Sequence, residues 1–176
     1  HGRTSDFTLF ARWTANTLAV TYNSGGGSSV TATSTTTGGT VVIPGTPTRA
    51  GYTFAGWYAA ASGGSAITFP YAHGRTSDFT LFARWTANTL SVSYDANGGT
   101  SPSGGVISTT TGSTLSSLAT TTRAGYGFTG WFTAASGGTQ VTTSAGHGQT
   151  AGFTLFARWT ANTLTVTTDE QGGTAI

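Results

Sequence analysis

Carboxylates are the side chains of this 176-residue chain most able to do acid–base chemistry, and they are scarce. The five acids are Asp6, Asp78, Asp95, Asp169 and Glu170. Glycoside hydrolysis needs two carboxylates held across a cleft. Each long repeat of the chain contains a single acid, Asp78 in one and Asp95 in the next. We therefore expect the acids to be solvated loop residues and the chain not to be an enzyme.

The three histidines share one position in a repeated segment. His1, His73 and His147 stand roughly 73 residues apart, and each precedes a glycine. A metal site needs two or more ligands that converge, so one histidine per repeat cannot form one within a unit, and only packed chains could bring two together. The chain has no cysteine, and no Ser-His-Asp set recurs within a repeat. These patterns predict no catalytic group, no metal site and no cofactor.

Composition excludes further classes. Only 7% of residues are charged, against roughly 25% in ordinary soluble domains. The net charge is +2 without a basic cluster, which argues against a nucleic-acid partner. No 18-residue apolar run is present, so we expect no membrane insertion in this segment. The chain is Thr-rich, yet 12% of its residues are aromatic and recur at fixed places, which predicts a folded protein with an uncharged, hydroxyl-rich surface.

Long internal repeats organise the sequence. The string HGRTSDFTLFARWTANTL stands at 1–18 and again at 73–90, with a near copy at 147–164. A second block, TRAGY followed by an aromatic run and SGG, occupies 48–64 and 122–138. The chain thus divides into the closing strand of a truncated repeat (1–16), complete repeats at 17–88 and 89–162, and the opening strand of a truncated repeat (163–176).

Apolar residues alternate with polar ones in the repeated blocks. Leu18, Val20 and Tyr22 follow period two, as do the residues of FTLFARW at 79–85, which is typical of β-strands. Asp95–Gly99 predicts a turn, because Asn and Gly accept positive φ. Leucines three apart in 114–119 predict one or two helical turns. The expected fold is mainly β with little helix, an α+β class of small repeated domains.

Aromatic residues supply the candidate core and a candidate contact surface. Small domains have few large side chains, so we expect the tryptophans to be structural core. They are Trp13, Trp57, Trp85, Trp131 and Trp159. On the opposite face of the closing strand, a phenylalanine and an arginine two residues apart can make cation–π contacts. These pairs are candidate intermodule or interchain contacts, or else a covered second face: Phe10 and Arg12, Phe82 and Arg84, Phe156 and Arg158.

Three ordered motifs resemble the Listeria–Bacteroides repeat, also called the internalin B-repeat. They are the turn motif at Tyr94–Gly99, the aromatic block at Pro47–Tyr58 and the closing strand at Thr80–Trp85. Pro47 becomes Thr121 in the second repeat. The resemblance covers both complete repeats and the two partial ones. It implies tandem β-grasp-like (ubiquitin- or SUMO-like) domains of about 72–74 residues, found in bacterial surface proteins.

The resemblance implies an extracellular structural array on the bacterial cell surface, as a stalk or filament segment of an adhesin. Its partners would be neighbouring repeats or identical chains in a fibre. The alternative is a binding module whose repeats recognise a glycan or protein receptor. A β-grasp-like sheet places its first and last strands side by side and parallel. We therefore expect Leu90-Val92-Tyr94 and Phe153-Leu155-Trp159 on adjacent parallel strands.

Overall fold

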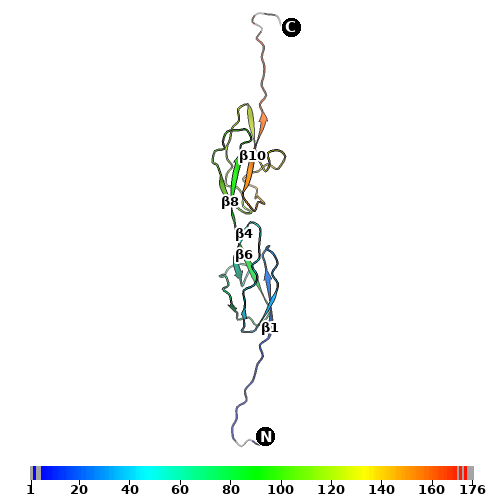
Figure 1. Ribbon diagram of the computed structural model, residues 1–176, viewed down its shortest axis with the longest axis vertical. Coiled ribbons are helices and arrows are strands. Elements are labelled where there is room, and N and C mark those ends of the chain that lie inside the picture. The colour runs from blue at the N-terminus through cyan, green and yellow to red at the C-terminus, as the bar shows by residue number, and fades with distance from the viewer. Residues whose placement is uncertain (1, 3–4, 170, 172, 174–176) are drawn as a thin grey trace. The chain divides into compact units, whose positions relative to one another are not determined.

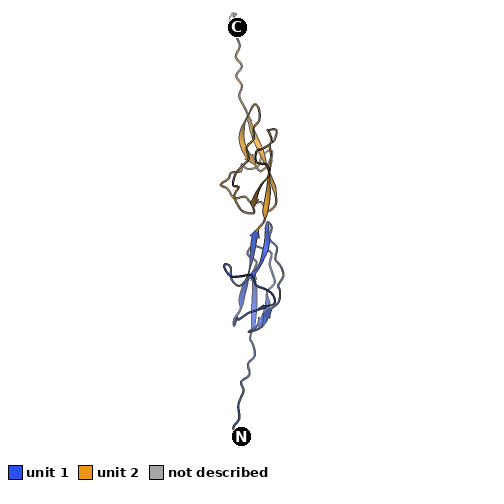
Figure 2. Ribbon diagram, turned by 90° about the vertical axis from the view of Figure 1, so that its left-hand side faces the viewer, with its two compact units in different colours: residues 1–86 blue, residues 87–176 orange. Residues whose placement is uncertain are grey.

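The computed structural model describes residues 2, 5–169, 171 and 173, and the chain divides into two compact units, residues 1–86 and 87–176 (Figures 1 and 2). Every regular element in the described part is a β-strand, so the mainly β prediction is confirmed. Unit 1 contains β1 (Thr17–Asn23), β2 (Thr33–Thr36), β3 (Thr40–Val41), β4 (Tyr52–Tyr58), β5 (Tyr71–Ala72) and β6 (Phe79–Ala87). Unit 2 contains β7 (Thr89–Asp95), β8 (Ile107–Thr110), β9 (Tyr126–Phe132) and β10 (Phe153–Ala161).

Each unit is built on a four-stranded mixed sheet. The strand order is β2-β1-β6-β4 in unit 1 and β8-β7-β10-β9 in unit 2, and β3 pairs with β5 in a separate two-stranded sheet. The first and last long strands of each unit are parallel neighbours. In unit 2, Val92 lies opposite Phe153 and Tyr94 opposite Leu155. This confirms the predicted parallel pairing.

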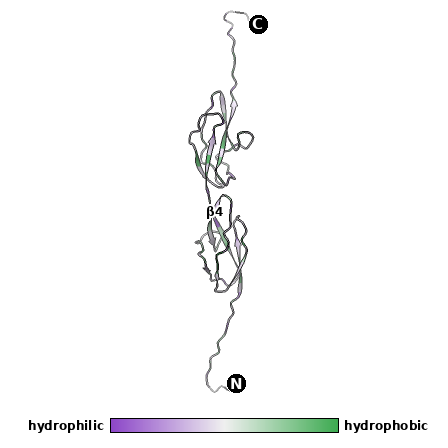
Figure 3. Ribbon diagram, in the orientation of Figure 1, coloured by the Kyte–Doolittle hydropathy of each residue, from purple (hydrophilic) through white to green (hydrophobic). Residues whose placement is uncertain are grey.

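The alternating residues of the paired strands form one core in each unit. Val20, Leu81 and Trp57 are buried together in unit 1, and their counterparts in unit 2 are Val92, Leu155 and Trp131. Hydrophobic and hydrophilic residues intersperse along the strands in Figure 3. Burying each such large side chain contributes about 1.5–3 kcal/mol, so the period-two pattern fixes which face of the sheet turns inward.

The turn after the first strand is the same in both units. The amide of Gly99 donates to the carbonyl of Ala96 at 3.0 Å, and the two residues between them have positive φ, 47° at Asn97 and 86° at Gly98. Unit 1 repeats this turn with glycines at both central positions. A Cβ added at Gly99 would lie 2.4 Å from Cζ2 of Trp159. The motif thus needs glycine at its end because a tryptophan packs against the backbone.

The prediction of helical turns at 114–119 is wrong. This segment is irregular, with Thr114 bridged to Gly146 and Leu115 only 2% exposed. A six-residue segment is far below the roughly 12–15 residues at which isolated helices become stable. Two leucines three apart therefore do not suffice, and the segment instead buries Leu115 from an irregular backbone.

The segments assigned to truncated repeats form no strand in their described residues, 5–16 and 163–169. Trp13 is 92% exposed and Leu164 is 84% exposed. The corresponding strands of the complete repeats, β6 and β7, each lie between two partner strands. This sequence does not contain the equivalent partners for the two end segments, and lone strands leave their backbone groups unpaired.

Candidate functional site

The histidines and carboxylates of the two complete repeats take structural positions within their own units. His73 is 6% exposed, its Nε2 lies 3.2 Å from the hydroxyl of Thr35, and its Nδ1 accepts the amide of Arg75. His147 contacts Thr109 in the same way, at 3.1 Å. Across the described residues, no three histidine or acidic side chains gather as a metal site would require.

The carboxylates of the two complete repeats bind backbone amides. Asp78 accepts the amide of Ala19 at 2.7 Å, which ties β1 to the approach of β6. Asp95 accepts the amide of Asn97 at 2.8 Å inside the turn. Asp6 is exposed, Asp169 accepts the amide of Gln171 at 3.0 Å, and His1 and Glu170 lie outside the described residues. These contacts position backbone and bring no two carboxylates together.

The candidate contact arginines of the closing strands bind inside their own units. The guanidinium of Arg84 lies 3.9 Å from the ring centroid of Tyr58, and it donates to the carbonyls of Ala60, at 2.9 Å, and Gly63. Arg84 therefore fixes the loop that follows β4 to the outer face of the sheet. Such a cation–π contact contributes about 0.5–2 kcal/mol.

Unit 2 repeats this arrangement more loosely. Arg158 lies 4.3 Å from the ring centroid of Phe132 and donates to the carbonyl of Ala134 at 3.3 Å. Phe82 and Phe156 are half-buried beside these arginines. The third pair differs, because Phe10 is 85% exposed and Arg12 is exposed. The arginines of two of the three pairs thus contact an aromatic ring and a loop of their own unit.

The tryptophans fall into three environments. Trp57 and Trp131 are 3% and 1% exposed at the centre of the cores. Trp85 and Trp159 pack at the core edge, where the Nε1 of Trp85 donates to the carbonyl of Ser24 at 2.8 Å and that of Trp159 to Ala96 at 2.9 Å. Trp13 departs from the expected core position, because its segment has no sheet to pack against.

A second pair of arginines was missed at the sequence level. Arg49 stacks at 3.9 Å on Tyr52 and donates to the carbonyl of Gly25 at 3.1 Å, which fastens the first turn to the aromatic block. In unit 2, Arg123 stacks at 3.9 Å on Tyr126 and donates to the carbonyl of Asn97 at 3.3 Å. The Arg-x-x-Tyr spacing, which occurs in both repeats, could have predicted these stacked pairs.

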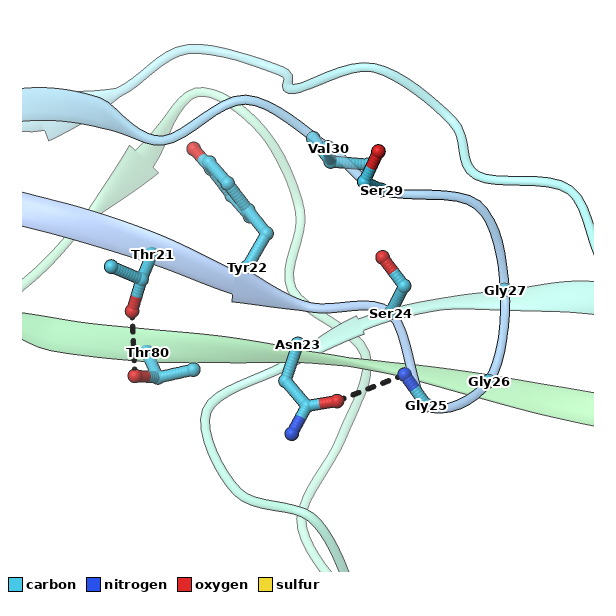
Figure 4. Close-up of a pocket in the computed structure, with 10 residues that line it drawn as sticks. All are labelled: Thr21, Tyr22, Asn23, Ser24, Gly25, Gly26, Gly27, Ser29, Val30 and Thr80. Carbon is cyan, nitrogen blue, oxygen red and sulfur yellow. Dashed lines mark hydrogen bonds between the residues drawn. The ribbon is translucent and has the colours of Figure 1, made fainter.

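A polar groove of about 560 Å³ lies along the first hairpin (Figure 4). Two hydrogen bonds lie within its lining: the hydroxyls of Thr21 and Thr80 are 2.7 Å apart, and the amide oxygen of Asn23 accepts the backbone amide of Gly25 at 2.9 Å. The hydroxyl of Tyr22 contacts Thr33 at 2.8 Å. These hydrogen bonds hold the hairpin together.

Comparison with known proteins adds the family context. The Listeria-Bacteroides repeat domain model matches residues 19–84 and 91–158. Internalin H of Listeria monocytogenes is 36% identical over 119 residues, 68% of this chain and 21% of its own length. Two Evansella cellulosilytica proteins, named as a Gly-rich membrane protein and a membrane protein, are 29% and 28% identical over 96% of this chain.

The chain spans a quarter or less of the length of these curated relatives. The part of the chain that the structure describes contains no helix able to cross a membrane.

Proposed function

This chain belongs to the Listeria–Bacteroides repeat family, and from that premise we propose that it is a load-bearing segment of an extracellular bacterial surface protein, a stalk or filament of an adhesin. The names of its relatives, an internalin and membrane proteins, support a cell-surface location. We infer complete repeats at 17–88 and 89–162.

The observation that carries the proposal is the parallel pair of strands in each unit. In unit 1, β1 and β6 pair over Val20–Asn23 and Phe79–Phe82. Since they are parallel neighbours, the chain enters a unit at one end of this pair and leaves at the other. A force on the termini then loads all the hydrogen bonds of the pair together. This strand order also supports a β-grasp-like assignment, with the irregular segment around Leu115 in place of a crossover helix.

Single-molecule force spectroscopy on the full chain tests the proposal. Pulling at the two termini is expected to give two separate unfolding events, one per unit. Each event releases roughly 200 Å of chain, since about 70 residues extend from a compact unit. Gradual extension at low force, without discrete events, would contradict the load-bearing role and favour the alternative, a receptor- or glycan-binding module.

A further inference from the structure

The closing strand of unit 2 has an identical copy that lies outside both sheets. The 9 residues of β10, FTLFARWTA, occur unchanged at 7–15. In unit 2 they lie between β7 and β9, where Leu155 and Ala157 are 0% exposed. The copy at 7–15 forms no strand, and Leu9, the counterpart of Leu155, is 84% exposed. Both segments therefore carry the side chains that suit this place in the sheet, and only β10 occupies it.

The residue before the closing strand differs between the two units. In unit 1 this residue is Asp78, and its carboxylate accepts the amide of Ala19 at 2.7 Å. Unit 2 has Gly152 at this position and Ser91 in place of Ala19. A Cβ added at Gly152 would lie 3.1 Å from the carbonyl oxygen and 3.8 Å from the amide nitrogen of Ser91. An aspartate at this position would therefore bring its carboxylate to that amide, and unit 1 shows that the same strand pair accommodates it.

The copy at 7–15 is preceded by such an aspartate. Asp6 stands before it as Asp78 stands before β6. In the place of β10, Asp6 would accept the amide of Ser91, a hydrogen bond that Gly152 has no side chain to make. Hydrogen bonds to an ionised acceptor are roughly twice as strong as neutral ones. The copy thus adds one strong contact in unit 2, whereas in unit 1 it would only reproduce the contact of Asp78.

We propose that residues 6–15 of one copy of this chain replace β10 in unit 2 of a second copy, parallel to β7 and antiparallel to β9, the directions in which β10 itself pairs. Asn16 joins the exchanged strand to β1 as Asn88 joins β6 to β7, so the linker keeps its sequence. The contact is heterologous, so it repeats from copy to copy. This inference rests on the proposed filament role and names the partner, a second copy of the chain.

Exchange competes with the β10 of the same chain, whose tether gives it an effective concentration on the order of millimolar. The test therefore unfolds the full chain in denaturant and refolds it at millimolar concentration. Two variants, Thr8→Cys and Ser93→Cys, are mixed before refolding, and the sequence has no other cysteine. Thr8 is the counterpart of Thr154, whose hydroxyl lies 2.8 Å from that of Ser93. Mild oxidation should then join the two variants by a mixed disulfide as the main product.

A register control uses Thr14→Cys in place of Thr8→Cys. Thr14 is exposed, and its counterpart Thr160 lies opposite Gly127, on β9. In the exchanged strand it would stand roughly 20 Å along β10 from the contact with Ser93. The yield of mixed disulfide should fall several-fold. An equal yield with Thr14→Cys, or no mixed disulfide with Thr8→Cys, would overturn the proposal.

A locked variant tests whether β10 must leave. Ser93→Cys with Thr154→Cys in one chain, oxidised in dilute solution, ties β10 to β7. After refolding at millimolar concentration, sedimentation should show multimers for the reduced form and monomers for the oxidised form. Leu9→Asp should also abolish the multimers without changing the stability of either unit, since Leu9 is exposed.

Asp6→Asn should reduce the multimers several-fold, because the ionised acceptor for Ser91 is lost. Multimers that persist in the oxidised locked variant or in Leu9→Asp would overturn the exchange. This outcome is distinct from failure of the load-bearing role, because single-molecule pulling uses one isolated chain in which no second copy takes part.

Discussion

Units 1 and 2 share the same strand pairing and first turn but differ in the hydrogen bonding and packing around the central tryptophan. Both pair their first and last long strands in parallel and fasten the first turn with an arginine. In unit 2 the indole of Trp131 donates to the carbonyl of Ala119, and Leu118 packs against the core, while in unit 1 the indole N–H of Trp57 has no acceptor in the described structure. The comparison teaches that the strand pair and turn define the repeat, whereas the segment beside the tryptophan varies.

The largest expected effect comes from deleting the central tryptophans. Trp57→Ala and Trp131→Ala should each lower the free energy of unfolding of their unit by about 3–5 kcal/mol. The loss should be greater for Trp131, which also makes a hydrogen bond. Denaturant unfolding of the full chain, followed by the NMR signals of Trp85 and Trp159, separates the two units. Trp13→Ala, at a 92% exposed site, is the neutral control.

The turn glycines should give the next largest effect. Gly27→Ala and Gly99→Ala each place a Cβ 2.4 Å from Cζ2 of a tryptophan, and overpacking of this kind costs about 1–3 kcal/mol. Because the contact is identical in both units, the two losses should be similar when measured by denaturant unfolding. Gly74→Ala and Gly148→Ala, which meet open space, should change stability little; a comparable loss at these positions would refute the packing explanation.

Arginine removal should distinguish the units more finely. Arg84→Ala should cost about 1–2 kcal/mol, since it loses a stacked ring and charged hydrogen bonds. Arg158→Ala should cost less, because Arg158 lies farther from its ring and from its carbonyl acceptor. Hydrogen exchange of the loops after β4 and β9 would show the loosening directly. Equal protection in wild type and Arg84→Ala would show that Arg84 does not hold its loop.

The smallest effect concerns pH. Burial raises the pKa of Tyr94, against a smaller opposing contribution from the backbone of Ala119. The folded unit 2 therefore holds this proton more tightly than the unfolded chain. The stability it confers is present below the ordinary tyrosine pKa of about 10 and is lost as pH rises through the higher folded value. Thermal unfolding from pH 9 to 11 should decline less steeply in Tyr94→Phe; identical slopes would contradict this.

Sequence patterns predicted the strands and the turn well, because both depend on residues close together in the chain. The alternation at Leu18 and Val20 gave the buried face, and Asn97-Gly98 gave the turn. The contacts of Arg49 and Arg84 could not be derived in this way, since their carbonyl acceptors lie more than 20 residues distant in the chain. The irregular path of 114–119 depends likewise on a bridge to Gly146, which local propensity does not encode.

Direction-dependent force measurement tests the load-bearing account most directly. In one geometry the full chain is pulled from its termini, which shears β1 against β6. In the other, handles at Asn16 and Gly38 peel the β1–β2 hairpin of unit 1, whose strands are antiparallel neighbours. Shearing should require a several-fold higher force than peeling, because the hydrogen bonds break together and not one at a time. Equal forces in the two geometries would contradict the account.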